Sequence, residues 1–505
     1  MNIGNARGFM SHPTYQNLIG GEWVPAASGK TFLNLNPADS TDVIGAFPSS
    51  DAEDVAQAVA AAKKAFATWR LVPAPKRAEI LLRTGNLLVQ NKEKYAREMT
   101  REMGKVLAET RGDVQEAIDE AFYVAGEGRR LFGVTTPSEL ENKFAMSVRM
   151  PLGVVGLITP WNFPMAIPSW KLFPALVAGN TCVIKPAEDT PLSTYNLVQT
   201  LMDAGLPPGV VNIVAGFGPH AGAPLVEHRD VRAISFTGSS EVGSLVGQRA
   251  AANFKPVSLE MGGKNAQIVL DDANLDLALD GALWGAFGTT GQRCTATSRI
   301  LLQKGIAAEF TERLVARAKK LKVGNGLDEQ AEVGPQVNKQ QIETSARYVE
   351  IALSEGAKLL AGGSVLTGGS HAHGNFFAPT VFGGVTSSMR IAREEVFGPV
   401  VSLLEFETFE QAIEIANSIE YGLSTALYTK DVNRAFTAMR DLEAGITYIN
   451  APTIGAEVHL PFGGVKQTGN GHREGLGAID FFTTWKAVYV DYSDKLQRAQ
   501  IDNAE

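Results

Sequence analysis

The strongest constraint on the fold is a regular alternation of short apolar segments with helical segments, which begins at residue 152. Four apolar segments have the length of buried strands: GVVGLIT, TCVIKP, VNIVAG and RAISFTG. Apolar residues recur at helical spacing in the stretches that follow them, at 170–178, 191–203, 219–227 and 239–252. Because strands that alternate with helices build βαβ units, this pattern predicts a parallel sheet with helices on its faces.

The alternation repeats after residue 264 and predicts a second α/β domain. Its strands are AQIVLD and RILLQ, and its helices are expected at 275–288 and 305–321. A chain of 505 residues exceeds one ordinary hydrophobic core, so two or three domains are expected. The segments outside the alternation are a β-meander near 17–46, helices at 51–70 (with Asp51 as N-cap), 75–91, 93–102 and 106–131, and strands at 143–150 and 485–493.

The acidic composition argues against a nucleic-acid partner. The net charge is −8, and no dense cluster of Lys and Arg is present. Two cysteines cannot form a disulfide framework in a chain of this size, which favours a reducing compartment. The uncharged segment 151–170 is long enough to cross a bilayer, but its prolines at 160, 164 and 168 would break a membrane helix. We therefore expect a soluble cytoplasmic protein without a secretory signal or a membrane partner.

Two side chains are candidates for covalent and acid–base chemistry. Cys294 follows a Gly-rich turn, where backbone amide dipoles and the charge of Arg293 favour a thiolate. Glu260 precedes Met261 and a Gly-Gly pair, an apolar turn that suits a general base because it would raise the pKa of the carboxyl group. Taken alone, an unreactive thiol and an ordinary surface carboxylate remain the alternatives. The second cysteine, Cys182, lies in an apolar strand segment and is expected to be inert core.

Three loops that follow predicted strands are candidates for a nucleotide site. GFGPHAG contains Gly218 and Gly222, and the spacing of its glycines differs by one residue from the Rossmann fingerprint. It is therefore a weak signal. FTGSSEVG opens a helix that Ser239 can cap, so its free amides can bind a phosphate. VIKPAEDTP places Lys185 and Glu188 after a parallel strand, where a carboxylate can bind two ribose hydroxyls and would repel a 2′-phosphate. An ordinary turn and solvated loop charges remain the alternatives for each loop alone.

Seven motifs in the same order resemble those of the aldehyde dehydrogenase superfamily. They are PWNFP (160–164), KPAE (185–188), FTGSSEVG (236–243), LEMGGK (259–264), GQRC (291–294), EEVFGPV (394–400) and PFGG (461–464). The resemblance runs from about residue 17 to residue 492. It implies oxidation of an aldehyde to a carboxylic acid by a nicotinamide-dependent enzyme.

The resemblance also implies the roles of the catalytic side chains. Cys294 matches the nucleophile that forms a thiohemiacetal and then a thioester. Asn162, together with the backbone N–H of Cys294, matches the pair that stabilises the oxyanion. Glu260 matches the base that activates water for thioester hydrolysis, and Glu474 in GHREG resembles a glutamate that relays protons.

By the same resemblance the cofactor is NAD by preference, with NADP as the alternative. Lys185 and Glu188 match the residues that bind the adenosine ribose, and Glu395 matches the carboxylate on the nicotinamide ribose. No metal site is implied. The full set of implied cofactor-binding residues is Thr159, Pro160, Trp161, Lys185, Glu188, Gly218, Gly222, Phe236, Gly238, Ser239, Met261, Glu395 and Phe397.

The implied fold is α/β and aldehyde dehydrogenase-like, with a Rossmann-type NAD-binding domain at 1–128 and 150–262. An α/β catalytic domain is implied at 263–474. Residues 129–149 and 475–505 would form a bridging β arm that completes a sheet in a neighbouring copy, which implies a homo-oligomer, either a dimer or a tetramer.

The substrate is expected to be a semialdehyde with a distal carboxylate. GQRCT with Arg293, and the loop INAPTIGAEVHLPFGG with Phe462, resemble the antiquitin-like and 2-oxoglutarate-semialdehyde-type branches. Glu116 in DVQEAID matches a glutamate that binds the substrate amine in antiquitin-type enzymes, so the aminoadipate semialdehyde type is also open. A broad-specificity aliphatic or aromatic aldehyde oxidiser is the rival. A thiol hydrolase and a catalytically silent structural relative are the alternatives from other classes, and the presence of both Cys294 and Glu260 argues against the silent relative.

Overall fold

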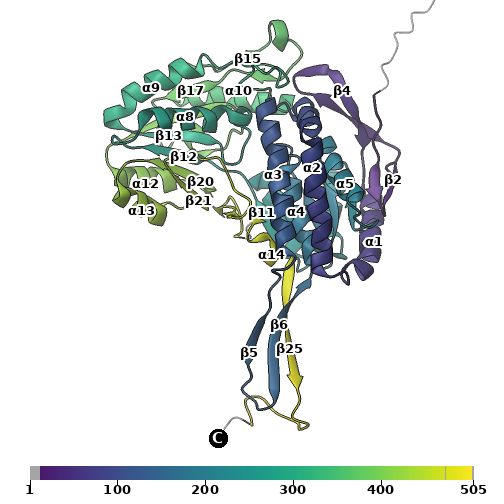
Figure 1. Cartoon of the computed structure of the whole chain (residues 1–505). Helices are drawn as coiled ribbons and strands as arrows, with labels where there is room; N and C mark the ends of the chain where they lie inside the picture. The colour runs from purple at the N-terminus through teal and green to yellow at the C-terminus, as the bar shows by residue number, and fades with distance from the viewer. Residues whose placement is uncertain (1–11, 472–473, 503–505) are drawn as a thin grey trace, which may run out of the picture.

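The computed structural model describes residues 12–471 and 474–502. Two helix-covered sheets form the body, and a narrow three-stranded arm extends away from it (Figure 1). Among the described residues, no helix has both the length and the apolar content needed to span a membrane.

The first sheet has seven strands in the order β11-β10-β7-β8-β9-β1-β2. The strands from β11 to β9 are parallel, and β1 and β2 extend the sheet in the antiparallel sense. Their bounds are β7 (Val154–Ile158), β8 (Thr181–Lys185), β9 (Val211–Ile213), β10 (Val231–Thr237), β11 (Val257–Glu260), β1 (Asn17–Ile19) and β2 (Glu22–Val24).

Side chains alternate across this sheet and divide its core in two. Val155 and Leu157 pack with one set of helices, whereas Val154 and Ile158 pack with the other. The first set comprises α2 (Ala74–Met103), α3 (Leu107–Glu127), α4 (Ala166–Ala178) and α5 (Pro191–Asp203). The second set comprises α1 (Ala52–Trp69), α6 (Ala223–Glu227) and α7 (Ser240–Ala251). Cys182 is fully buried in the first half of this core, as expected for an inert thiol.

The second sheet has the order β14-β17-β18-β13-β12-β20-β21, and only its edge strand β14 is antiparallel. The bounds are β12 (Asn265–Val269), β13 (Thr297–Gln303), β14 (Lys358–Ala361), β17 (Thr380–Gly383), β18 (Val400–Phe406), β20 (Ser424–Tyr428) and β21 (Ile446–Ile449). One face packs against α8 (Leu275–Phe287) and α9 (Lys304–Ala318), and the other against α10 (Lys339–Ser354), α12 (Phe409–Asn417) and α13 (Val432–Asp441).

The arm is a separate antiparallel sheet with β6 between β5 and β25. Its strands are β5 (Val134–Pro137), β6 (Lys143–Pro151) and β25 (Thr483–Asp491). Chain segments more than 300 residues apart therefore lie side by side along the arm (Figure 1). The remaining strands and α-helices are β3 (Thr31–Asn36), β4 (Asp39–Pro48), β15 (Val365–Leu366), β16 (Phe376–Phe377), β19 (Tyr421–Gly422), β22 (Pro461–Phe462), β23 (Val465–Lys466), β24 (Glu474–Gly475), α11 (Arg390–Arg393) and α14 (Ala478–Phe481).

Several predicted boundaries are wrong for identifiable reasons. The helices predicted at 75–91 and 93–102 are one helix, α2, because no Gly or Pro interrupts the chain between residue 86 and its end at Met103. The predicted N-terminal meander is divided: β1 and β2 join the first sheet, and β3 and β4 form a separate hairpin. The helix predicted at 170–178 begins already at Ala166, because Pro168 lies in its first turn, where a proline costs no backbone hydrogen bond.

Candidate active site

Two cavities meet at Cys294. The larger, of about 380 Å³, is lined by six of the residues implied to act in catalysis or substrate binding: Glu116, Glu260, Arg293, Cys294, Phe462 and Glu474. The smaller, of about 220 Å³, is lined by nine implied residues: Pro160, Trp161, Asn162, Gly238, Ser239, Met261, Cys294, Glu395 and Phe397. Met261 and Thr237 also line both cavities. The same cysteine therefore lines both cavities.

Cys294 lies in a turn just before strand β13. The preceding 3-10 turn, Gly288–Gly291, contains Thr289 and Thr290 with φ of 52° and 59°, in the left-handed region. The Cys294 carbonyl accepts a hydrogen bond of 2.8 Å from Asn265 Nδ2. The hydroxyl-rich stretch that follows is buried packing, in which Thr453 Oγ1 bonds Thr297 Oγ1 at 2.8 Å and donates to the Thr295 carbonyl at 2.7 Å.

The expectation that the Arg293 charge favours a Cys294 thiolate is wrong for this structure. Burial, together with the nearby carboxylates of Glu395 and Glu260, raises the pKa of the Cys294 thiol to about 12. Arg293 does not offset this effect, because its guanidinium is directed to Glu109 and Thr289. The free enzyme therefore holds the cysteine as a neutral thiol at pH 7.

Asn162 lies at the start of the segment that leads into α4. Its side chain is buried, and Nδ2 donates a hydrogen bond of 3.1 Å to the carbonyl of Gln292, two residues before Cys294. This bond connects the PWNFP loop to the cysteine loop. Its place beside Cys294 in the smaller cavity is compatible with a role at an oxyanion, which stays a prediction.

The two implied acid–base residues come from different strands, and both line the larger cavity. Glu260 is the last residue of β11, in register with Thr237 of β10. Glu474 forms a buried ion pair with Lys171 of α4, and Lys171 Nζ also donates to Ser235 Oγ at 2.8 Å. Lys171 was not identified from the sequence, where it is one lysine in an apolar helix. The proton-relay role of Glu474 stays a prediction.

The smaller cavity has the form of a nucleotide site. Trp161 and Phe397 lie edge to face with ring centroids 5.2 Å apart. Ser239 is the N-cap of α7, where its hydroxyl accepts from the Val242 N–H at 3.2 Å, as the sequence predicted. Glu395 accepts from the Gly263 N–H at 2.9 Å, and burial raises the pKa of this carboxyl to about 7.

The other implied cofactor residues lie outside both cavities, at or near the carboxyl ends of the first sheet's strands. Lys185 ends β8 and forms an ion pair of 2.9 Å with Glu188. Gly218 and Gly222 bound a single π-helical turn that follows β9. Phe236 lies in β10, against Gly238, and Thr159 follows β7.

The residues present fit a dinucleotide. The Thr159 and Thr237 hydroxyls are buried and make no hydrogen bond among the described residues. A Cβ at Gly238 would come within 2.5 Å of the Phe236 ring, so this turn admits only glycine beside the cavity without displacement of that ring. Buried donors without partners and a close backbone approach at a helix N-terminus are features that a phosphate or ribose can satisfy.

The three residues implied to bind substrate have different surroundings. Arg293 Nε donates to Thr289 Oγ1 at 2.8 Å, and its Nη2 lies 3.5 Å from Glu109 Oε1. Burial raises the pKa of Glu116 to about 8, and the neighbouring Asp113 contributes. Phe462 packs edge to face on Trp170 at 5.5 Å.

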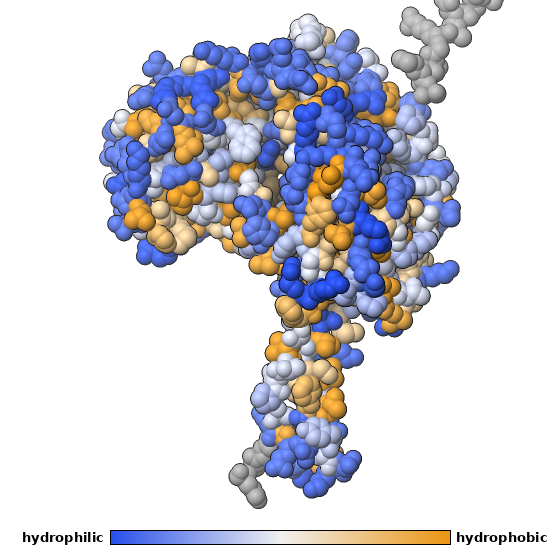
Figure 2. Space-filling model, viewed as in Figure 1, coloured by the Kyte–Doolittle hydropathy of each residue, from blue (hydrophilic) through white to orange (hydrophobic). Residues whose placement is uncertain are grey.

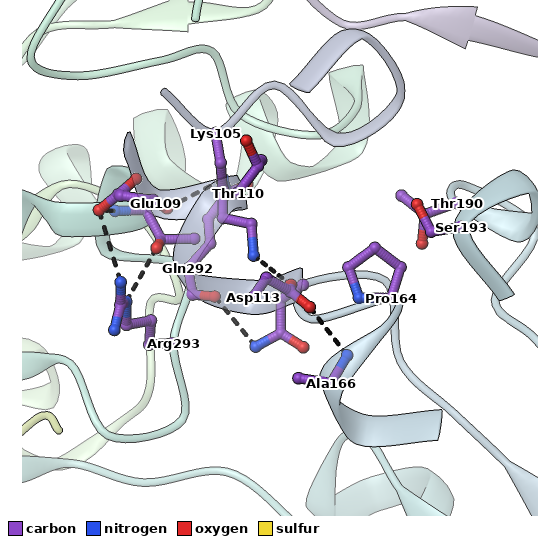
Figure 3. Close-up of polar contacts among 12 residues, drawn as sticks. Lys105, Glu109, Thr110, Asp113, Pro164, Ala166, Thr190, Ser193, Gln292 and Arg293 are labelled. Carbon is purple, nitrogen blue, oxygen red and sulfur yellow. Dashed lines mark hydrogen bonds and ion pairs between the residues drawn. The ribbon is translucent and has the colours of Figure 1, made fainter. Parts of the chain in front are cut away.

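Sequence reasoning missed Glu109, which contacts the cysteine loop, and the pair of Asp113 and Lys105, which contacts the loop that carries Asn162 (Figure 3). Glu109 and Asp113 are four residues apart in a predicted helix, so their shared face could be read from the sequence. Their partners in the two loops could not be read from the sequence, because those partners lie 53 to 184 residues away.

Comparison with known proteins identifies the family. The chain matches the model of the aldehyde dehydrogenase family over residues 23–488. It is 44% identical over 478 residues to the alpha-ketoglutaric semialdehyde dehydrogenase of Bacillus subtilis strain 168, with 94% of this chain and 98% of that protein covered. It is 42% identical over 485 residues to the alpha-ketoglutarate semialdehyde dehydrogenase of Haloferax volcanii, with 96% and 100% covered.

A solved structure agrees with the fold. The betaine aldehyde dehydrogenase of Staphylococcus aureus in complex with NAD+ matches with a TM-score of 0.93 at 35% identity, over 95% of this chain and 96% of that one. The family model and both relatives span nearly the whole chain, and the seven motifs lie around the two cavities and the first sheet's carboxyl edge. The chain thus belongs to the aldehyde dehydrogenase family, and it is an aldehyde-oxidising oxidoreductase with that family's α/β fold.

Proposed function

We propose that this enzyme oxidises a short semialdehyde bearing a distal carboxylate, of the 2-oxoglutarate semialdehyde type, and uses NAD. The observation that carries the proposal is the larger cavity, in which Cys294 and Glu260 lie together with Arg293. Arg293 is the only cationic side chain among the described residues that line this cavity. The names of the two semialdehyde dehydrogenases that resemble this chain support the same substrate class.

The acidic residues of the cavity do not contradict a carboxylate substrate. With a pKa of about 8, Glu116 is mostly neutral at pH 7 and can donate a hydrogen bond to a carboxylate. Glu109 is paired with Arg293. The apolar remainder of the wall, which includes Phe163, Ile167 and Trp170, favours the second candidate function, a broad-specificity aldehyde dehydrogenase.

The chain's own residues supply the covalent chemistry. Cys294 passes its proton to Glu260, from which the proton leaves to solvent, and the sulfur adds to the aldehyde carbon. This gives a thiohemiacetal oxyanion that receives hydrogen bonds from the Asn162 side-chain amide and the Cys294 N–H. To offer that amide, Asn162 shares or exchanges its bond to the Gln292 carbonyl. The bound nicotinamide supplies the hydride acceptor that converts the thiohemiacetal to a thioester. Glu260 then takes a proton from water as the water attacks the thioester, and Cys294 leaves as the thiolate.

The smaller cavity and the neighbouring sheet edge would hold the dinucleotide. Glu395 and Phe397 line the end nearest Cys294, and Ser239 lies at the N-terminus of α7, where a pyrophosphate is favoured. Lys185 and Glu188 lie where an adenosine ribose would follow. The NAD complex of the betaine aldehyde dehydrogenase supports NAD as the cofactor, and the Glu188 carboxylate supports its preference over NADP.

The implied domain division and assembly belong to the same proposal. The first sheet would be the NAD-binding domain, the second sheet the catalytic domain, and the arm the contact for a homo-oligomer, which we propose to be a tetramer. The two sheets and the projecting arm support this division. Two free cysteines without a disulfide support a cytoplasmic location.

Two variants test the proposal. Cys294→Ala is expected to abolish aldehyde oxidation while NAD still binds, and Glu260→Gln is expected to give one burst of NADH and then stall at the thioester. Wild-type kcat/KM is compared for 2-oxoglutarate semialdehyde and hexanal. Steady turnover by Glu260→Gln at the wild-type rate would exclude the deacylation role, and a preference for hexanal would favour the broad-specificity alternative.

A further inference from the structure

We propose that the beginning of α3 positions the two loops that form the catalytic site. Glu109 would fix the loop that carries Cys294, and Asp113 would fix the loop that carries Asn162. The inference rests on the proposed role of Cys294 as nucleophile. The two carboxylates are four residues apart on one helix and therefore project from the same side, and both line the larger cavity.

Glu109 makes two contacts with the cysteine loop. Its Oε1 accepts a hydrogen bond of 2.6 Å from the Thr289 N–H and lies 3.5 Å from Arg293 Nη2. Arg293 Nε in turn donates to Thr289 Oγ1 at 2.8 Å, which closes a ring of three residues. The Glu109 and Arg293 side chains are only 11% and 13% exposed, so water screens these contacts weakly.

The cysteine loop needs such support because its backbone is strained. Thr289 and Thr290 have φ of 52° and 59°, a left-handed conformation that is unfavourable for β-branched residues. A strained conformation of this kind persists only where its surroundings hold it, and it is typical of functional sites. The hydrogen bond from the Thr289 N–H to a carboxylate fixes the first of these two residues.

Asp113 makes the corresponding contacts with the other loop. Its Oδ1 accepts a hydrogen bond of 2.8 Å from the Ala166 N–H, at the start of α4 and four residues after Asn162. Its Oδ2 pairs with Lys105 Nζ at 2.6 Å, and both side chains are fully buried. The Lys105 ammonium also lies 3.9 Å from the centre of the Phe163 ring, in the same loop.

The two loops are joined directly by the bond from Asn162 Nδ2 to the Gln292 carbonyl. The distance between the Asn162 amide and the Cys294 N–H therefore depends on the positions of both loops. α3 packs with the first sheet, whereas the cysteine loop follows α8 of the second, so Glu109 connects the two units across the site. A misplacement of about 1 Å at a reacting centre can cost about 100-fold in rate, which makes this connection consequential.

Glu109→Ala in the full-length enzyme tests the first contact. We expect kcat for NADH production to fall about tenfold to 100-fold, while the Kd for NAD stays unchanged because Glu109 does not line the smaller cavity. Alkylation of Cys294 by iodoacetamide should become faster, since a released loop would expose the half-buried thiol more fully. Glu109→Gln retains an oxygen that can accept from the Thr289 N–H and should recover most of kcat.

Asp119→Ala is the matched control, because Asp119 is exposed on the same helix and bonds the neighbouring Gln115 at 2.8 Å. If Glu109→Ala does not fold, Glu109→Asp replaces it, since aspartate keeps the charge but is too short for the Thr289 N–H. Wild-type kcat and wild-type alkylation in a folded Glu109→Ala would overturn the proposal. A wild-type enzyme that forms no NADH from any aldehyde would overturn the proposed function instead, and the alkylation rates would still decide the role of Glu109.

Asp113 is tested by two double variants that both remove the buried charge pair. Lys105→Met with Asp113→Asn retains an oxygen for the Ala166 N–H, whereas Lys105→Met with Asp113→Ala removes it. We expect the Asn form to keep most of kcat and the Ala form to lose about tenfold or more. Equal kcat in the two folded forms would exclude a positioning role for Asp113.

Discussion

Arg293 adjoins the nucleophile and carries the only positive charge among the described residues lining the larger cavity. Its guanidinium offers more donors than its contacts with Thr289 and Glu109 use, and the free ones can bind a substrate carboxylate. We expect Arg293→Ala to raise KM for a carboxylate-bearing semialdehyde about tenfold to 100-fold more than KM for hexanal, since a charge-assisted hydrogen bond contributes about 1.5–3 kcal/mol. The increase in KM should be selective also because the Glu109 carboxylate loses its cationic partner and would repel a carboxylate substrate.

Steady-state kinetics with both aldehydes on one purified variant decide this prediction. Arg293→Lys is the matched control, because lysine keeps the charge without the planar guanidinium. Its KM for the semialdehyde should lie between those of the wild type and Arg293→Ala. An equal increase in KM for both aldehydes would assign Arg293 to support of the cysteine loop alone and would favour the broad-specificity enzyme.

The Cys294 thiol should show a characteristic pH dependence in the absence of cofactor. Because its pKa is raised to about 12, the neutral form dominates at pH 7, and the thiolate fraction grows about tenfold with each pH unit. Iodoacetamide reacts with the thiolate, so its rate with the free enzyme should still be rising at pH 9. A positively charged nicotinamide nearby favours the thiolate, so added NAD should shift the profile to lower pH. Cys294→Ala is the control that measures the reaction of iodoacetamide with Cys182. A rate that reaches a plateau near pH 7 without NAD would contradict the raised pKa of Cys294.

At the scale of single elements, the loop after β8 should control the choice of cofactor. Glu188 extends from this loop, 35% exposed at its side chain and paired with Lys185. Its carboxylate would face the ribose and repel the 2′-phosphate of NADP. We expect a higher kcat/KM with NAD, and Glu188→Gln should raise the kcat/KM ratio of NADP to NAD about tenfold, as the removal of one charge repulsion allows. Glu241→Gln is the control, because it also removes one acidic side chain, in the first turn of α7. Equal kcat/KM with the two cofactors in the wild type would refute the preference.

The elements also show how far sequence patterns reach. The βα alternation predicted β7, β8, β9 and β10 of the first sheet and β12 and β13 of the second, because a buried parallel strand is a short apolar run and αβ loops carry their own Gly and Ser signals. It did not predict β11 or the other five strands of the second sheet. The motifs located Cys294, Glu260 and Asn162 because each motif is a short run of consecutive residues. The Glu109 contacts escaped because they join residues 180 and 184 positions apart, and the raised Cys294 pKa escaped because burial depends on the whole site.

On the scale of the whole molecule, the arm is the part that the fold leaves uncovered. Apolar patches run along it in Figure 2, and Val134, Trp485 and Tyr489 are 54%, 51% and 67% exposed. Its outer strands β5 and β25 each have an open edge among the described residues. An exposed apolar sheet with free edges is a surface that pairs with another chain. A second copy of this chain is the partner that the family resemblance implies.

Removal of residues 484–505 should therefore lower the mass of the assembly. The truncation deletes almost all of β25 and leaves β6 paired only with β5, so a second copy would lose the β25 edge that it pairs with. Light scattering at several concentrations should show a smaller species, or aggregation if the exposed β6 edge pairs without specificity. Removal of residues 494–505 is the control, because it spares β25 and should leave the mass unchanged. An assembly of undiminished mass after the longer truncation would exclude the β25 edge as the contact between copies.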